Sequence, residues 1–206
     1  MKKKQVSGVR QIVLASGNSG KLKEFQKMLG ALKIEMLPQS DFNVSSVDET
    51  GLTFVENAIL KARHAAEITG LPVIADDSGL EVDALNGQPG IYSARYAGEG
   101  ATDVTNNEKL LAKLKGIASG ERTARFWCVL VYLRHRSDPT PIICQASWEG
   151  FILEEPRGKD GFGYDPLFFV PSEHCASAEL PPETKSCLSH RAQAMHMLAE
   201  RLKAHC

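Results

Sequence analysis

The chain has 206 residues, enough for one sizeable domain or two lobes, and its composition, 43% hydrophobic and 24% charged, is that of a globular protein rather than a disordered one. Its 24 basic and 25 acidic residues give a formal net charge of −1, so it has no strong field to hold a nucleic acid, and any anionic partner is expected to be small. The sequence has no apolar run of signal-peptide or membrane-span length, so we expect no membrane partner. Its five cysteines include no C-x-x-C pair, so we expect reduced thiols in a cytoplasmic protein.

The first part of the chain is predicted to form a strand, a helix and a second strand. Residues 11–15 (QIVLA) are a short apolar run followed by a turn sequence, which is typical of a buried strand. Apolar residues then recur at helical spacing from about Gly20 onward, which indicates an amphipathic helix. Residues 33–37 are predicted to form a second strand, stopped by Pro38.

Residues 53–69 have the clearest helical pattern in the chain. Thr53 and Glu56 form a capping box at the start of this helix, and Gly70 is a typical helix stop. Residues 72–75 (PVIA) follow directly, and we expect them to form a third short buried strand that ends at the acidic sequence DDSG.

The second half is predicted to contain more loops and antiparallel strands. Residues 87–100 are rich in Gly, Tyr and Ala and are expected to form a long ordered loop, followed by a short helix over residues 106–114. The β-branched and aromatic residues of 125–134 and 141–153 predict a long β-hairpin, and residues 189–204 predict a final helix.

These elements together favour an α/β fold. Early β-α-β units with a later hairpin predict a mixed β-sheet flanked by helices. We expect residues 1–206 to form one domain, in which loops at strand ends line a central ligand-binding cleft.

The first candidate site is a glycine-containing loop between the first strand and the first helix. Its glycines let backbone N–H groups approach an anion, the helix start adds a positive dipole end, and Lys21 adds a full charge. It is not a Walker A loop, since only two residues separate the glycines and Leu22 replaces the Ser or Thr. A tight turn with a solvated lysine explains the pattern equally well. The candidate phosphate-binding residues are Ser16, Gly17, Asn18, Ser19, Gly20 and Lys21.

Two acidic pairs form the second candidate site. Asp76 and Asp77 follow the third predicted strand, and Asp48 and Glu49 precede the capped helix. Mg²⁺ prefers one or two carboxylates and leaves its other positions to water and phosphate oxygens, so the two pairs are suited to hold one ion while one carboxylate activates water. Taken alone, the pairs are explained better as a turn and a helix cap.

Three further groups are candidates for contacts with the rest of a ligand. Asn57 and Lys61 share one face of the capped helix and can reach into the same cleft. The aromatic sequence GFGYDP can stack on a base. Cations near the start of the last helix are unfavourable with respect to the helix dipole, so an anionic or carbonyl-bearing partner would account for them. A solvated polar stripe, an aromatic turn and a surface cluster are the alternatives for the three groups. The candidate base-stacking loop contains Phe162, Gly163, Tyr164 and Asp165, and the cations suited to an anionic or carbonyl-bearing partner are Lys185, His190 and Arg191.

The motifs taken together resemble one known family. The segments SGNSGKLKEF, DETGLTFVENAILKARHAAEITGLPVIADDSGLEVDALNGQPGIYSARY, GFGYDPLFF and KSCLSHRAQA are similar to those of the inosine/xanthosine triphosphate pyrophosphatase family, and within it to the bacterial dITP/XTP pyrophosphatases. The resemblance implies a two-lobed α/β fold with a central nucleotide-binding cleft, a homodimer, and Mg²⁺-dependent hydrolysis of ITP, dITP and XTP to the monophosphate and pyrophosphate. Such an enzyme removes non-standard purines from the nucleotide pool.

The resemblance also implies a role for each matching residue. Residues 16–21 correspond to the triphosphate-binding loop, with Ser16 where Thr is common. Asp77 corresponds to the general base and metal ligand, and Ser78 to a substrate contact. Asp48 stands where the bacterial enzymes often carry Glu as the second metal ligand, a task that Glu49 can share. The base-binding positions are Phe162, Gly163, Tyr164, Asp165, Lys185, His190 and Arg191.

The expected mechanism follows from these roles. Mg²⁺ bridges the triphosphate oxygens, Lys21 and the loop amides neutralise charge, and Asp77 or Asp76 orients water for attack on the α-phosphorus. Donors from Lys185, His190 or Arg191 are expected to meet the 6-oxo group of the base and to remain unpaired against ATP.

Two other classes of function remain open on the sequence. One is a related hydrolase that acts on modified pyrimidine or other nucleoside triphosphates. The other is a non-catalytic nucleotide sensor built on the same fold, which the intact Asp76–Asp77 pair disfavours.

Overall fold

The structure, a computed structural model, describes residues 9–17 and 19–204, without the side chain of Ser19. The chain divides into two compact units. The first unit contains the described residues of Met1–Asp77, Val129–Cys144 and Ala194–Cys206, and the second unit contains Ser78–Cys128 and Gln145–Gln193. The expectation of one domain over residues 1–206 stays a prediction.

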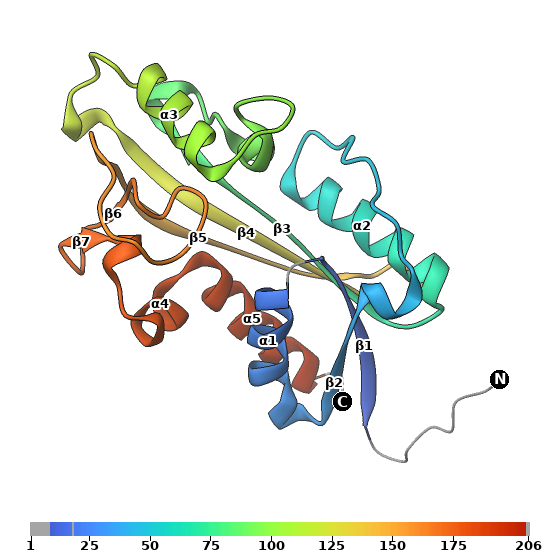
Figure 1. The fold of residues 1–206 in the computed structure, drawn as a ribbon. Coiled ribbons are helices and arrows are strands. Elements are labelled where there is room, and N and C mark those ends of the chain that lie inside the picture. The colour runs from blue at the N-terminus through green and yellow to red at the C-terminus, as the bar shows by residue number, and fades with distance from the viewer. Residues whose placement is uncertain (1–8, 18, 205–206) are drawn as a thin grey trace. The chain divides into compact units, whose positions relative to one another are not determined.

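A mixed seven-stranded sheet runs through the fold in the order β2-β1-β3-β4-β5-β6-β7 (Figure 1). β1 pairs in parallel with β2 and β3, whereas β6 pairs antiparallel with β5 and β7. The predicted α/β fold with a mixed sheet is therefore confirmed. The strands are β1 (Arg10–Ala15), β2 (Ile34–Pro38), β3 (Val73–Val82), β4 (Thr123–Leu133), β5 (Ile142–Ile152), β6 (Phe168–Val170) and β7 (Cys175–Ala176).

Five α-helices are described, and each predicted helix is found among them within a few residues. The short helix α4 is not anticipated by the apolar pattern, because seven residues are too few to show a helical period. No described helix combines the length and apolarity needed to cross a membrane. The helices are α1 (Ser19–Leu29), α2 (Phe54–Thr69), α3 (Asp103–Lys113), α4 (Pro182–Leu188) and α5 (His190–Ala204).

In the first unit, helices cover both faces of the parallel strands. Figure 1 shows α2 on one face and α1 on the other. The buried side of α2 carries small residues, among them Ala58, Ala62 and Ala65, which are fully buried and let the helix backbone approach the sheet closely. Residues 12–14 of β1 are likewise fully buried, as expected for a parallel strand covered on both faces.

The second unit has its own hydrophobic core. Its buried residues come from α3, from the second-unit parts of β3, β4 and β5, and from β6, and Phe168 packs between Phe126 and Trp148 at ring-centroid distances of 4.6 and 5.3 Å. The segment predicted as a long loop over residues 87–100 contains the 3₁₀ helix Gly90–Arg95. This core gives the loops of the second unit a rigid base.

The third strand differs from its prediction. We expected it to end at Ala75, but β3 continues through the acidic pair to Val82. A strand tolerates charges at its centre when each one finds a partner, and both aspartates of β3 have a lysine partner. The acidic pair therefore lies inside a strand and not in a loop, which corrects the sequence prediction.

Candidate functional site

The two adjacent aspartates of β3 point to opposite faces of the sheet, because side chains alternate along a strand. Asp76 pairs with Lys21 of α1, and Asp77 pairs with Lys61 of α2 at 2.6 Å between Oδ1 and Nζ. Since α1 and α2 cover opposite faces (Figure 1), one dipeptide places a carboxylate against each helix. Both aspartates are largely buried, so the helix positions determine which cation each one meets.

Lys61 collects two carboxylates around one ammonium group. Its Nζ lies 2.6 Å from Oδ1 of Asp77 and 3.0 Å from Oε1 of Glu49. Burial alone would lower the pKa of Lys61, but Asp77 and Glu49 outweigh that effect, so the pKa lies above its usual value. Burial raises the pKa of Asp77 to about 6: Lys61 offsets only part of the rise, and the charges of Glu49 and Asp76 add to it.

The two lysines are shared differently among these carboxylates. Lys21 pairs with Asp76, whereas Lys61 is shared between Asp77 and Glu49. A further cation near Asp77 would favour its charged form and so oppose the rise in its pKa, which is due mainly to burial.

The position of Glu49 follows from local structure at the start of α2. Thr53 caps the helix by accepting the N–H of Glu56, and the Glu56 carboxylate accepts the N–H of Leu52, which confirms that the two residues cap the helix. Gly51 donates its N–H to Oδ1 of the buried Asn57 at 2.8 Å, and a Cβ on Gly51 would lie only 2.7 Å from that oxygen. Because Gly51 packs this tightly, the acidic turn that precedes it is held beside α2.

The predicted phosphate loop lies at the start of α1. The helix begins at Ser19, Gly17 and Gly20 are exposed, and Lys21 in the first turn reaches Asp76. A Cβ on Gly17 would lie 3.9 Å from Nε2 of Gln39, an ordinary van der Waals distance. Asn18 and the side chain of Ser19 lie outside the described residues. An open loop leading into a helix N-terminus is suited to bind phosphate oxygens.

The two residues of the other acidic pair have different surroundings. Asp48 is exposed, whereas Glu49 is half-buried and shares Lys61 with Asp77. Among the described residues, no group of three or more Asp, Glu, His or Cys side chains is placed to hold a metal ion. Two carboxylates are sufficient for Mg²⁺ when a bound phosphate supplies further oxygens. The structure brings Glu49 and Asp77 together around one cation, which fits such an ion.

The predicted base-binding residues form a second cluster, within the second unit. Phe162 is 55% exposed, and two cations flank its ring: Nζ of Lys185 lies 5.6 Å from the ring centroid and Cζ of Arg191 lies 5.7 Å from it. An exposed aromatic ring of this kind is available for stacking on a planar ligand.

Asp165 connects the Phe162 loop to Lys185 within this cluster. Its buried carboxylate accepts hydrogen bonds from the Phe162 N–H, from the Ser177 hydroxyl at 2.8 Å and from Lys185 at 2.5 Å. Gly161 has a φ of +82°, and a Cβ there would lie 2.2 Å from Oδ2 of Asp165, so only glycine fits. The buried Asp165 carboxylate is thus one support of the loop conformation.

Two other predicted base-binding residues are held in the core of the second unit. The His190 ring stacks on Phe126 with a centroid distance of 4.9 Å and an interplanar angle of 16°. Tyr164 is 4% exposed, its hydroxyl donates to the Ser93 carbonyl at 2.8 Å, and burial raises its pKa. Ser78, the predicted substrate contact, is half-buried on β3.

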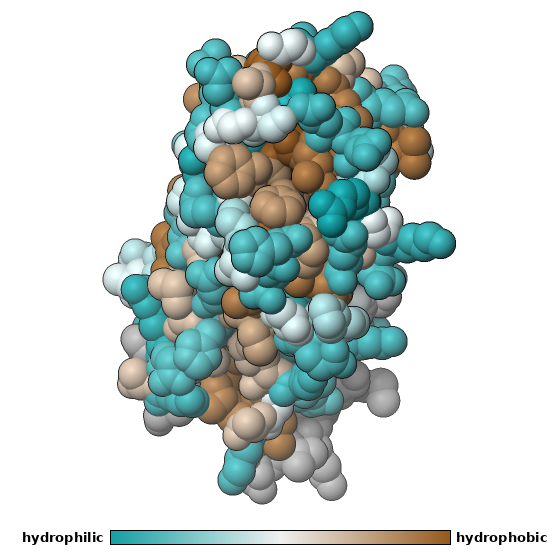
Figure 2. Space-filling model, turned by 90° about the vertical axis from the view of Figure 1, so that its left-hand side faces the viewer, coloured by the Kyte–Doolittle hydropathy of each residue, from teal (hydrophilic) through white to brown (hydrophobic). Residues whose placement is uncertain are grey.

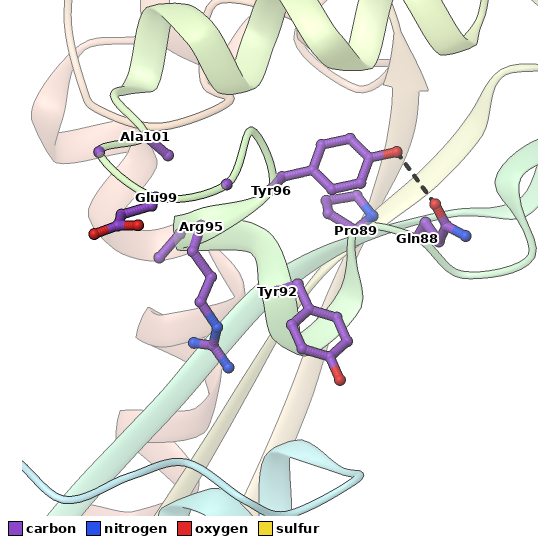
Figure 3. A pocket seen from close by; sticks show the side chains of 10 residues that line it. Gln88, Pro89, Tyr92, Arg95, Tyr96, Glu99 and Ala101 are labelled. Atoms are coloured by element: carbon purple, nitrogen blue, oxygen red, sulfur yellow. Dashed lines mark hydrogen bonds between the residues drawn. The ribbon is translucent and has the colours of Figure 1, made fainter.

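A separate cavity of about 780 Å³ also belongs to the second unit. Figure 3 shows Tyr96 beside Pro89, with its hydroxyl donating to Oε1 of Gln88, and Tyr92 and Arg95 at the same cavity. All ten residues that line it come from the segment 88–101, and none of them is a predicted site residue. This cavity is therefore distinct from the aromatic cluster of the second unit.

Some residues of the site were not selected from the sequence. The sequence leaves the roles of Lys61 and Glu49 undecided. The helical spacing of Asn57 and Lys61 alone is explained better by a solvated polar stripe than by a ligand site. The groups that support the Phe162 loop carry no sequence signal, because a hydrogen bond to a distant loop leaves no local pattern. They are the side chains of Asp103, Asn107 and Ser177 and the backbone carbonyl of Ser93.

Comparison with known proteins gives a consistent result. A model of the Ham1 family matches residues 12–201. A Vibrio parahaemolyticus protein named dITP/XTP pyrophosphatase is 62% identical over 196 residues, which cover 95% of this chain and 98% of that protein. An Escherichia coli K12 protein of the same name is 57% identical over 195 residues, 95% of this chain and 99% of that protein. The structure of a HAM1 protein from Coxiella burnetii, 52% identical, matches with a TM-score of 0.92 over 95% of this chain and 100% of that one.

Proposed function

Because the chain belongs to the Ham1 family, we propose that it hydrolyses non-standard purine nucleoside triphosphates (ITP, dITP and XTP) to the monophosphate and pyrophosphate, and so cleanses the nucleotide pool. Its relatives named dITP/XTP pyrophosphatase cover nearly the whole chain at 57–62% identity. The structural observation that carries the proposal is the pair of lysine–carboxylate clusters on adjacent residues of β3, Lys21 with Asp76 and Lys61 with Asp77.

The reaction is proposed to depend on Mg²⁺, held by Asp77 and by the acidic turn before α2. Within that turn Glu49 is favoured over Asp48, because Glu49 and Asp77 already converge on one cation, the Lys61 ammonium. Hard carboxylate oxygens suit this metal, and the charges of Glu49 and Asp76 near Asp77 favour an added cation. When bound, the ion neutralises charge on the triphosphate oxygens.

The residues of the first unit have separate tasks in this proposal. Lys21 and the backbone N–H groups at the start of α1 bind the triphosphate, which requires Lys21 to exchange some of its contact with Asp76 for phosphate oxygens. Asp77 holds the attacking water by accepting its proton at Oδ, a task for which a carboxyl pKa of about 6 is suited near neutral pH. Lys61 keeps Asp77 oriented and limits how far its pKa rises.

The residues of the second unit are proposed to read the base. Phe162 stacks on the purine, while Lys185, His190 and Arg191 offer donors to its 6-oxo group. Adenine presents an amino donor at that position, so these protein donors would stay unpaired against ATP. Unpaired buried polar groups can lower reactivity about 10⁴-fold.

A nucleotide panel tests the proposal directly. ITP, XTP, dITP, dUTP, GTP and ATP are incubated with the protein, with and without Mg²⁺, and released pyrophosphate is scored against released phosphate. We expect pyrophosphate from ITP, dITP and XTP and none from ATP, and only with Mg²⁺. Preferred turnover of dUTP would favour a pyrimidine hydrolase, and binding without any turnover would favour a nucleotide sensor.

We further propose that the protein acts as a cytoplasmic homodimer. The family resemblance supports the dimer, and Figure 2 shows apolar side chains at the surface among hydrophilic ones, which a contact between copies would cover. Light scattering on the purified protein measures the assembly, and a mass of one chain would exclude the dimer.

A further inference from the structure

The loop that presents Phe162 is anchored by side chains of α3. The Gly163 N–H donates to Oδ2 of Asp103 at 2.7 Å, and the Gly163 carbonyl accepts a hydrogen bond from Nδ2 of Asn107 at 2.9 Å. Asp103 and Asn107 are four residues apart and therefore lie on one face of the helix. One helix thus binds both polar groups of a single loop residue.

A third anchor holds the next residue of the loop. The Tyr164 hydroxyl donates to the Ser93 carbonyl at 2.8 Å, in the core of the second unit. Ser93 is itself fixed, because its hydroxyl accepts the Leu80 N–H at 2.9 Å and donates to the Gly90 carbonyl at 2.6 Å. The 3₁₀ helix Gly90–Arg95 and β3 therefore act as a fixed support for the loop.

The backbone of this loop adopts conformations that favour glycine. Gly161 and Gly163, on either side of Phe162, have φ values of +82° and +61°, and glycine has the widest choice of backbone conformations. Phe162 itself is more than half exposed, so the protein encloses its side chain only in part. Bonds to the two residues after Phe162 consequently set where its ring lies relative to Lys185 and Arg191.

We propose that Asp103 and Asn107 of α3, together with the Tyr164–Ser93 hydrogen bond, are positioning devices that determine purine affinity without touching the nucleotide. This inference rests on the proposed function, since it assumes that Phe162 stacks on the purine base. It assigns Tyr164 to loop support rather than to contact with the base, and it adds α3 to the base-binding site.

The test uses Asn107→Ala, with Glu108→Ala as the matched control. Both residues lie on α3 and alanine favours the helix in both, but only Asn107 reaches the loop. Binding of inosine monophosphate is measured by calorimetry, and inhibition by inorganic triphosphate, which has no base, is measured in parallel. We expect Asn107→Ala to weaken inosine monophosphate binding about 3- to 10-fold, as for loss of one hydrogen bond, with inhibition by inorganic triphosphate unchanged.

Tyr164→Phe gives a second and independent measurement, because it removes only the hydroxyl that reaches Ser93. It should weaken inosine monophosphate binding by a similar factor, with kcat for ITP nearly unchanged. Unchanged affinity in both variants overturns the inference, as does an equal loss for inorganic triphosphate or for Glu108→Ala. Wild-type protein that binds no inosine monophosphate also overturns it, whereas absence of pyrophosphate release from ITP tests the proposed function separately.

Discussion

Asp77 in the first unit and Asp165 in the second are both buried carboxylates paired with a lysine, yet their surroundings differ. Asp165 accepts hydrogen bonds from a backbone N–H, a hydroxyl and Lys185. Burial raises the pKa of Asp77 to about 6; Lys61, which Asp77 shares with Glu49, offsets only part of the rise, and the charges of Glu49 and Asp76 add to it. A lysine–carboxylate pair thus supports a loop at Asp165, whereas Asp77 has a raised pKa of the kind that is common at functional sites.

The largest expected contrast is in turnover. Asp77→Asn removes the proton acceptor and should lower kcat for ITP about 10³-fold with little change in KM. Asp165→Asn should instead raise KM and lower the melting temperature, since it weakens the support of the Phe162 loop. Steady-state kinetics and thermal unfolding of both variants measure this contrast. Nearly full turnover by Asp77→Asn would remove that residue from the catalytic role.

The two lysines should differ in which part of the nucleotide they bind. Lys21→Ala should weaken ITP binding about 10- to 100-fold, as for loss of a charged hydrogen bond, and leave inosine monophosphate binding much less affected. Lys185→Ala should weaken both ligands by a similar factor, because both carry the base. Calorimetry with the two nucleotides gives the ratio, and equal losses for Lys21→Ala would contradict its assignment to the triphosphate.

The raised pKa of Asp77 should also make the stability of the protein depend on pH. A carboxyl whose pKa is raised to about 6 keeps its proton in the folded state at pH values where the unfolded chain has lost it. Between about pH 4 and pH 6 the folded state binds more protons, so the free energy of unfolding falls as pH rises, and the loss persists above that window.

Asp77→Asn removes this loss of stability at high pH, because the amide carries no charge. Without metal at pH 8, the variant should be more stable than wild type by about 1–3 kcal/mol, and the difference should disappear near pH 4. Urea denaturation in the presence of a chelator at both pH values measures it. A variant that is less stable than wild type at pH 8 would show that the charge of Asp77 is stabilised by its hydrogen-bond and ion-pair partners.

The smallest expected contrast lies within the acidic turn. Glu49→Gln should raise the Mg²⁺ concentration for half-maximal activity about tenfold, since Glu49 shares a cation with Asp77. Asp48→Asn, at an exposed position, should have a smaller effect. Titration of Mg²⁺ against ITP turnover measures both, and the reverse order would assign the second ligand to Asp48.

The elements of the fold were largely readable from local patterns. The cap at Thr53, the stop at Gly70 and the apolar runs of β1 and of the β4–β5 hairpin all lie where the sequence predicts them. The length of β3 was not readable, because two consecutive aspartates followed by Ser and Gly are typical of a turn. Only the lysines of α1 and α2, distant in sequence, make those charges acceptable inside a strand.

The sequence by itself determined the kinds of groups present: a glycine loop with a lysine, two acidic pairs, and an aromatic loop followed by cations. It did so because turn, cap and helix preferences act over a few residues. The tertiary structure alone decided that Glu49 rather than Asp48 faces Asp77, that Tyr164 lies in the core, and that α3 holds Gly163. Those outcomes depend on where side chains of separate elements meet, and burial and electrostatic compensation exist only once the chain has folded.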